Sequence, residues 1–241
     1  YSDHFETVYP ILCDRGIKGI FFPPAKPIIE NSVLDVNKIQ FIIAVCKDTN
    51  KLLNYTKDAI NKYQEEYQLN SFDAYWNRYG KPHCYDNPTV SFVKHMLQHA
   101  LPLTLRAHII KELFSQYVTK DEAAFSSELY MDTAQLREIV CGGMAIGSHG
   151  YNHQWMNCMS FIEQKSDIRA SLKFLKTLGI SLENWIMCYP YGAYNETLIE
   201  LVKKLGCGLG FTTQNTLANL NTHNPFCLPR LDTNKILELQ Y

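Results

Sequence analysis

Short apolar runs that alternate with helical patterns constrain the fold of this chain more than any other feature of its sequence. The runs with the length and composition of buried strands are 17–22, 144–147, 185–189 and 207–212. The segments in which apolar residues recur at helical spacing are 3–15, 132–141, 161–178 and 195–205. Strands that alternate with helices usually form a parallel sheet with crossover helices. The pattern therefore predicts an α/β fold.

A long helical stretch interrupts this alternation. Between residues 35 and 130 several segments follow helical spacing, and prolines at 82, 88 and 102 separate them. We therefore expect a mostly helical insertion at 35–130, while 1–34 and 131–241 form the α/β domain. The insertion could cover the mouth of a site, join two copies of the chain in a homo-oligomer, or serve packing alone. The sequence leaves these three roles open.

Charge and cysteine content limit the partners and the compartment. The 241 residues carry 23 Lys and Arg against 24 Asp and Glu, which argues against nucleic acid or an anionic membrane as the main partner. No run of about 18 apolar residues occurs, so we expect no membrane span. The eight cysteines lack a C-x-x-C pair, and four of them lie in apolar patterns typical of buried thiols: Cys13, Cys46, Cys188 and Cys207. This distribution favours a reducing, cytoplasmic compartment.

Two histidines stand four residues apart just beyond a predicted strand, in the stretch IGSHGYNH at 146–153. If this stretch is helical, both imidazoles share one face and can bind a single divalent metal. The carboxyl end of a parallel strand is also where α/β folds place their ligands. His149 and His153 are therefore predicted metal ligands, with ordinary polar loop residues as the alternative. Cys141 and Cys158 flank them, but at a spacing that matches no standard zinc module.

A rigid turn follows the next predicted strand, in the stretch YPYG at 189–192. Pro190 fixes one backbone angle, and Gly192 permits angles that other residues avoid. Asn195 and Glu196 then supply residues that commonly begin a helix. A strand that enters such a turn can present backbone groups at the same end of the sheet as the histidines.

Together these two stretches resemble the polysaccharide deacetylase family, the NodB-like carbohydrate esterases. That family carries a His-Ser/Thr-x-x-His metal motif and a Pro-Tyr-Gly motif at a later strand end. The resemblance implies a distorted (β/α)7 barrel of parallel strands, with both motifs on its rim. It also implies a metal-dependent hydrolase that removes N-acetyl groups from an acetamido sugar or glycan. Zinc is the expected metal, although nitrogen and carboxylate ligands also accept other divalent first-row ions.

The resemblance assigns roles to single residues. His149 and His153 would hold the metal, and the Tyr191 backbone N–H would stabilise the oxyanion of the tetrahedral intermediate. Pro190 and Gly192 would shape the substrate-binding turn, and Tyr189 would line the groove or pack beneath it. A plain strand-to-helix turn is the alternative for this segment.

The sequence also departs from the family pattern. Cys188 stands where many members have an arginine, but a subset with permuted motifs takes an arginine from a late strand instead. Arg230, in the stretch LPRLD at 228–232, is the candidate for that role, either orienting the base or binding substrate; a surface arginine is the alternative. The family's aspartate pair, which includes the base and a metal ligand, would precede Tyr1, and Asp3 is not its equivalent.

The general acid of the family has no match either. It is usually a histidine near the C-terminus, and no histidine follows Arg230; in the permuted subset it too would precede Tyr1. We therefore expect the chain as it stands to lack the base, the acid and one metal ligand. Two other functions stay open, a non-catalytic carbohydrate-binding relative that lost the base and an assembly subunit that works through the helical insertion. The particular sugar or polymer is not indicated.

Overall fold

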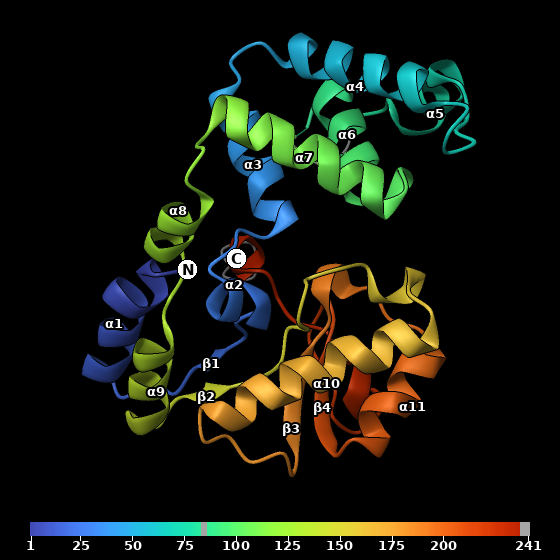
Figure 1. Cartoon of the computed structure of the whole chain (residues 1–241). Coiled ribbons are helices and arrows are strands. Elements are labelled where there is room, and N and C mark those ends of the chain that lie inside the picture. Colours follow the sequence, from blue (N-terminus) through green and yellow to red (C-terminus); the bar gives the residue numbers. More distant parts are fainter. Residues whose placement is uncertain (83–85, 237–241) are drawn as a thin grey trace. The chain divides into compact units, whose positions relative to one another are not determined.

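The computed structural model describes residues 1–82 and 86–236, and these fall into two compact units (Figure 1). Unit 1 comprises Tyr1–Ser32 and Ser126–Tyr241, and unit 2 comprises Val33–Phe125. The sequence-based boundaries fall after residues 34 and 130. Cys84 lies outside the described residues. The C-terminal stretch 237–241 also lies outside them; it belongs to the segment after Arg230, whose sequence contains no histidine.

Unit 1 is built on parallel strands. Strand β1 (Ile20–Phe21) pairs with β2 (Ala145–Ile146), and β3 (Trp185–Cys188) pairs with β4 (Cys207–Phe211), both in parallel. A parallel bridge between Ser148 and Met187 joins the continuation of β2 to β3. A second bridge places Leu228 beside Phe211. The segments thus lie side by side in chain order, and the expected parallel pairing is confirmed.

This array of strands is strongly curved. Phe22 directly follows β1 and Phe211 ends β4, and these strands lie three spacings apart, about 14 Å in a flat sheet. Their ring centroids are nevertheless only 6.1 Å apart. The expected closed barrel of seven strands, however, is not seen in residues 1–82 and 86–236, whose strands form two two-stranded parallel sheets joined by single bridges.

Helices cover the strands of unit 1. They are η1 (His4–Val8), α1 (Tyr9–Asp14), α2 (Ala25–Glu30), α9 (Thr133–Cys141), α10 (Phe161–Thr177), α11 (Glu196–Lys204) and α12 (Thr233–Ile236), with short 3-10 turns η3 (Met156–Cys158), η4 (Pro190–Gly192) and η5 (Pro225–Cys227). Helix α8 (Glu122–Leu129) spans the boundary between the units. Leucines and isoleucines of α9, α10 and α11 form one core with Trp185 and Met187. Burial of these apolar stripes, rather than helix propensity alone, stabilises the helices.

Capping residues determine where the crossover helices begin. Asp132 caps α9 in a capping box with Gln135, and Ser160 caps α10 in a capping box with Glu163. The Asn195 side chain accepts a hydrogen bond from the Leu198 N–H at the start of α11. The start of α10 follows the segment that carries the histidines, and the start of α11 follows the Pro-Tyr-Gly turn.

Unit 2 consists of helices with a core of their own. The helices are α3 (Asp35–Val45), α4 (Thr49–Tyr63), α5 (Phe72–Tyr79), α6 (Pro88–His95), η2 (Met96–Ala100) and α7 (Leu103–Tyr117). Fully buried side chains such as Ile60, Phe92 and Leu113 fill the space between them. That residues 35–130 are an insertion in the α/β domain stays a prediction.

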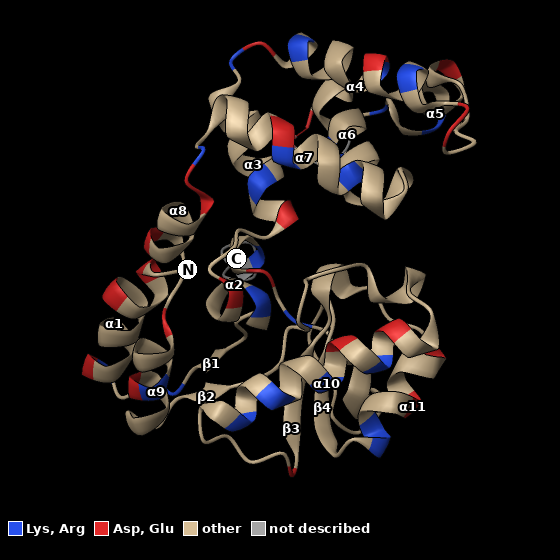
Figure 2. Cartoon of the chain, viewed as in Figure 1, with Lys and Arg blue, Asp and Glu red and all other residues tan. Residues whose placement is uncertain are grey.

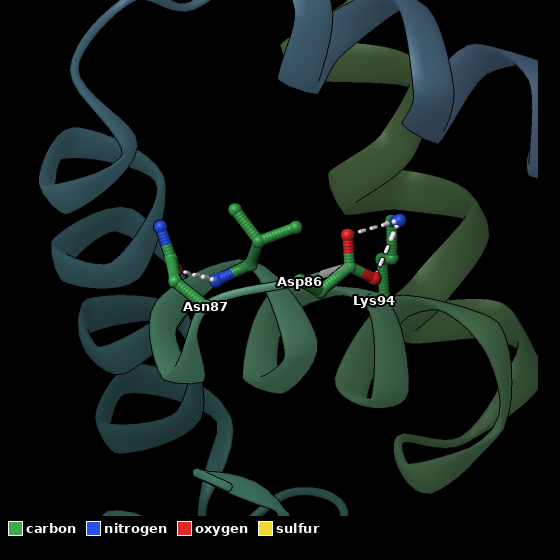
Figure 3. Close-up of polar contacts among 4 residues, drawn as sticks. Asp86, Asn87 and Lys94 are labelled. Carbon is green, nitrogen blue, oxygen red and sulfur yellow. Dashed lines mark hydrogen bonds and ion pairs between the residues drawn. The ribbon is translucent and has the colours of Figure 1, made fainter. Parts of the chain in front are cut away.

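Polar contacts fix the start of α6, the helix that leads to His95 (Figure 3). The Asn87 side chain accepts a hydrogen bond from the Val90 N–H at 2.9 Å. Lys94 Nζ lies 2.8 and 2.7 Å from the two carboxylate oxygens of Asp86.

A second ion pair joins Lys38 to Glu122 at 2.8 Å, and the same carboxylate accepts the Val33 N–H at 2.8 Å. Glu122, the first residue of α8, thereby binds the first residues of unit 2.

Charges of both signs occur along the helices of each unit, for instance on α4 and α10 (Figure 2). Among the described residues, no helix is both long and apolar enough to cross a membrane. The described cysteines are free thiols, and Cys46, Cys188 and Cys207 are buried as expected. The expectation for Cys13 is wrong, because it lies on the solvent-facing side of α1 and is exposed.

Candidate active site

The segment with the two histidines is a loop rather than a helix, and it still brings their rings together. The centroids of His149 and His153 lie 4.7 Å apart, with the ring planes at 73°. Gly150 has a φ of 71° and His153 a φ of 54°. These two left-handed positions turn the chain back on itself, so convergence comes from a tight loop and not from helical spacing.

Hydrogen bonds from helix α2 hold this loop in place. The N–H groups of Ala25 and Lys26, at the start of α2, donate to the carbonyls of Gly150 and Tyr151 at 3.3 and 3.1 Å. The Tyr151 hydroxyl donates to Glu30 at the end of the same helix at 2.6 Å. The loop is therefore anchored to an element more than 100 residues away in sequence.

Both imidazoles are neutral at pH 7. Burial lowers the pKa of His149 to about 4, with a further lowering by the charge of Arg230. Burial, with the charge of His149, lowers the pKa of His153 to about 3. Neutral imidazoles are the form that binds metal ions.

Hydrogen bonding selects the nitrogen that each ring can offer. His149 Nδ1 lies 2.6 Å from the Cys188 carbonyl oxygen, which can only accept, so Nδ1 carries the proton and Nε2 keeps a lone pair. The Nδ1 atom of His153 is buried and has no hydrogen-bond partner among the described residues. His149 Nε2 is therefore a nitrogen that could hold a cation, and the His153 ring lies beside it. Within residues 1–82 and 86–236, however, no group of three or more His, Cys, Asp or Glu could hold one.

The Pro-Tyr-Gly turn, η4, lies against the histidines. Tyr191 adopts a left-handed conformation (φ 58°, ψ 7°), and its ring centroid is 4.8 Å from that of His153. Gly192 has a φ of 67°, and a Cβ there would lie 2.3 Å from Thr213 Oγ1. Only glycine fits this position, because both the backbone angle and the space exclude a side chain.

Arg230 lies at the same end of the sheet. Its Nε donates to the Thr212 carbonyl at 3.0 Å, and the residue as a whole is exposed. Its positive charge lowers the pKa of His149 and opposes the effect of burial on the pKa of Cys188. The structure therefore brings together three of the predicted site residues, His149, His153 and Tyr191, and the charge of Arg230 acts on His149.

Two other predicted residues lie deeper. Pro190 is buried, and Tyr189 is 1% exposed and belongs to the hydrophobic core. The Tyr189 ring therefore packs in the core, which agrees with the packing alternative and not with a position lining the substrate groove. Tyr189 has an extended backbone (φ −72°, ψ 123°), whereas Tyr191 is left-handed, so the turn directs the two side chains differently.

Two residues near the histidines were missed by the sequence reasoning. Trp155 stacks on Tyr191 with centroids 4.6 Å apart and planes at 12°. Asp167 of α10 is buried, and its carboxylate accepts the N–H groups of Tyr151 and Asn152. A polar residue on the apolar face of a predicted helix was the available signal for Asp167.

Comparison with known proteins agrees with the two motifs. The family model described as "Polysaccharide deacetylase" matches residues 1–209, which contain both histidines and the Pro-Tyr-Gly turn. The chain belongs to the polysaccharide deacetylase family. Arg230 lies outside residues 1–209, the part of the chain that the family model matches. The resemblance drawn from the sequence is thus confirmed.

Several individual proteins are similar to this member of the deacetylase family. The "Putative polysaccharide deacetylase YxkH" of Bacillus subtilis (strain 168) is 28% identical over 85 residues, which cover 35% of this chain and 30% of the relative. The match thus spans less than a third of that relative. The Streptococcus pyogenes deacetylase PplD in complex with acetate is 17% identical with a TM-score of 0.42, over 93% of this chain and 98% of that one. A de-N-acetylase from Aggregatibacter actinomycetemcomitans is 15% identical with a TM-score of 0.46, over 99% and 71%.

Proposed function

We propose that this protein is a metal-dependent deacetylase that hydrolyses N-acetyl groups of an acetamido sugar or glycan. The observation that carries the proposal is the convergence of two buried, neutral imidazoles on one loop, beside the Pro-Tyr-Gly turn. Membership of the polysaccharide deacetylase family supports the class of reaction.

His149 and His153 would hold a divalent metal, most simply zinc. A bound metal of this kind supplies Lewis acidity and lowers the pKa of a coordinated water. His149 would bind through Nε2, since the Cys188 carbonyl holds the proton on Nδ1 and orients the ring. The low pKa values of both rings keep them in the binding form without competition from protons near pH 7.

Tyr191 would donate its backbone N–H to the oxyanion that forms when the amide carbonyl is attacked. The left-handed conformation of Tyr191 and the requirement for glycine at 192 make this turn rigid, so the donor would be in place before the reaction. Arg230, an exposed residue whose charge acts on His149, would orient the catalytic base or bind the substrate. The reaction also requires a carboxylate as base and third ligand, for which the family resemblance implies an aspartate pair.

A second candidate function is carbohydrate binding without catalysis. It is supported by the finding that the described residues offer two histidines but no third metal-binding group beside them. The stacked rings of Trp155 and Tyr191 lie beside His153, and aromatic rings of this kind could contact the face of a sugar in a protein that only binds it.

Acetate release from N-acetylglucosamine oligomers separates the two functions. The full-length protein, supplied with zinc, should release acetate, and His153→Ala should reduce the rate by at least about 100-fold because a metal ligand is lost. His108→Ala, at an exposed position in unit 2, is the control and should leave the rate unchanged. Acetate release that is insensitive to His153→Ala would contradict the proposal. Oligomer binding without acetate release would favour the carbohydrate-binding function.

A further inference from the structure

Three buried polar side chains form a stripe along the inner face of helix α10. Gln164, Asp167 and Ser171 are 1%, 4% and 1% exposed. Their spacing of three and four residues puts them on one face of the helix, together with core residues such as Ile168 and Leu172. Burying polar groups destabilises a fold unless each is hydrogen-bonded, so packing alone would favour apolar residues here.

Each member of this polar stripe bonds to the segment that carries the histidines. Ser171 Oγ lies 2.7 Å from Ser148 Oγ, just before His149. Gln164 Nε2 donates to the Met156 carbonyl at 2.8 Å, three residues after His153. The polar stripe therefore forms hydrogen bonds with both ends of the segment 148–156.

Asp167 holds the middle of the segment. Its two carboxylate oxygens accept the N–H groups of Tyr151 and Asn152 at 2.7 and 3.0 Å. These residues lie between the two histidines in sequence, and a Cβ added to the neighbouring Gly150 would lie 2.9 Å from Asp167 Oδ1. Hydrogen bonds from N–H groups to a carboxylate are among the stronger ones in proteins. The carboxylate thus fixes the part of the loop that determines the distance between the rings.

We propose that Asp167 is a positioning residue that sets the separation of the His149 and His153 imidazoles by holding the Tyr151 and Asn152 amides. Ser171 and Gln164 anchor the two ends of the same loop. Asp167 acts through the backbone, and both of its oxygens are engaged there. The consequence for metal affinity rests on the proposed function, whereas the consequence for loop geometry does not.

Asp167→Asn tests this role with little change in volume. The carboxamide has one accepting oxygen, and its NH2 group would face the second backbone N–H, so one of the two bonds is lost. Asp132→Asn is the matched control, because Asp132 also accepts a backbone N–H, that of Gln135 at 2.8 Å, but at the start of α9. Asparagine caps helices about as well as aspartate, so this control should resemble the wild type.

Two measurements need no metal. Hydrogen exchange of the Tyr151 and Asn152 amides should accelerate at least about tenfold in Asp167→Asn, while exchange in α11 should stay as in the control. The nuclear Overhauser effect between the ring protons of His149 and His153 should weaken. A third measurement is calorimetric zinc affinity, which should fall by about 10–100-fold, the usual effect of removing an outer-sphere partner.

The outcomes separate this inference from the proposed function. If the wild type binds no zinc, the proposed function fails, and the exchange and ring measurements still decide the role of Asp167. Unchanged ring contacts in Asp167→Asn overturn the inference, as does unchanged zinc affinity in a protein that binds zinc. If Asp167→Asn does not fold, Ser171→Ala removes only the contact to Ser148. It should weaken the ring contact to a smaller degree, and a wild-type ring contact in that variant would overturn the inference.

Discussion

The chain contains two histidine pairs with the same spacing in very different surroundings. In unit 2, His95 ends α6 and His99 lies in the following π-helical turn η2. Their rings are 5.1 Å apart, and His95 Nδ1 lies 2.9 Å from His99 Nε2. In unit 1, His149 and His153 lie on a loop with rings 4.7 Å apart.

The two pairs differ in the hydrogen-bond partners of their ring nitrogens. In unit 2 a ring nitrogen of one histidine is bonded to a ring nitrogen of the other. In unit 1 the Cys188 carbonyl holds the proton of His149 on the far side of the ring. The spacing of two histidines in the sequence therefore does not by itself indicate a metal site. The hydrogen-bond partner of each ring nitrogen is more informative.

The largest expected effect concerns metal binding by the two pairs. His149→Ala should weaken zinc binding by at least about 100-fold, because one of two imidazole ligands disappears. His95→Ala should leave zinc affinity unchanged, since that pair is engaged with itself. Calorimetric titration of the metal-free protein measures both. An equal loss of zinc affinity in the two variants would contradict this difference between the two histidine pairs.

An intermediate effect concerns the turn between the histidines. Gly150→Ala should lower the free energy of unfolding by about 1–3 kcal/mol, because a φ of 71° is strained for alanine. The new Cβ would also lie 2.6 Å from Met156 Cε. Gln98→Ala, between the histidines of unit 2, should change it by no more than about 0.5 kcal/mol, since alanine suits a helical turn. Urea unfolding of both variants checks this, and a Gly150→Ala protein as stable as Gln98→Ala would show that the loop is not rigid.

The smallest effect is a pH dependence of stability in unit 2. Burial, followed by the charges of His95, Arg106 and Arg78, lowers the pKa of His99 below 6.5. The unfolded chain then binds the proton more readily than the folded one, so this contribution to stability is complete above pH 6.5 and declines as the pH falls below it. His99→Gln should therefore lose less stability than the wild type between pH 7.5 and 5.5 in urea unfolding. An equal loss in both proteins would mean that His99 titrates as it does in the unfolded chain.

Much of the secondary structure could be read from the sequence. The segments predicted at 132–141, 161–178 and 195–205 appear as α9, α10 and α11 within a residue or two. Their apolar spacing and capping residues are local signals, and burial in the tertiary structure reinforces them. Helix α2 was missed, because Pro23, Pro24 and Pro27 suggest a turn or an extended segment. Pro24 in fact precedes the first helical residue, where a fixed φ is compatible with a helix start.

The candidate site was predicted less completely than the helices. The sequence placed His149, His153 and the Pro-Tyr-Gly turn just beyond two parallel strands, and the structure brings them together. It offered a helix as the reason for their convergence, whereas the structure has a loop with two left-handed residues. Tyr189 could not be separated from Tyr191, since residues two apart share one face of an extended segment and only the left-handed backbone of Tyr191 directs the two side chains differently.

By itself the sequence determined the order of strands and helices, the family, and the two stretches at the strand ends. Only the tertiary structure decided which nitrogen of His149 carries the proton and which residue holds the loop. The first depends on a carbonyl 39 residues away and the second on a carboxylate 15 or 16 residues away. Propensity and spacing report on neighbours along the chain, whereas hydrogen-bond partners of this kind exist only once the strands and helices have packed.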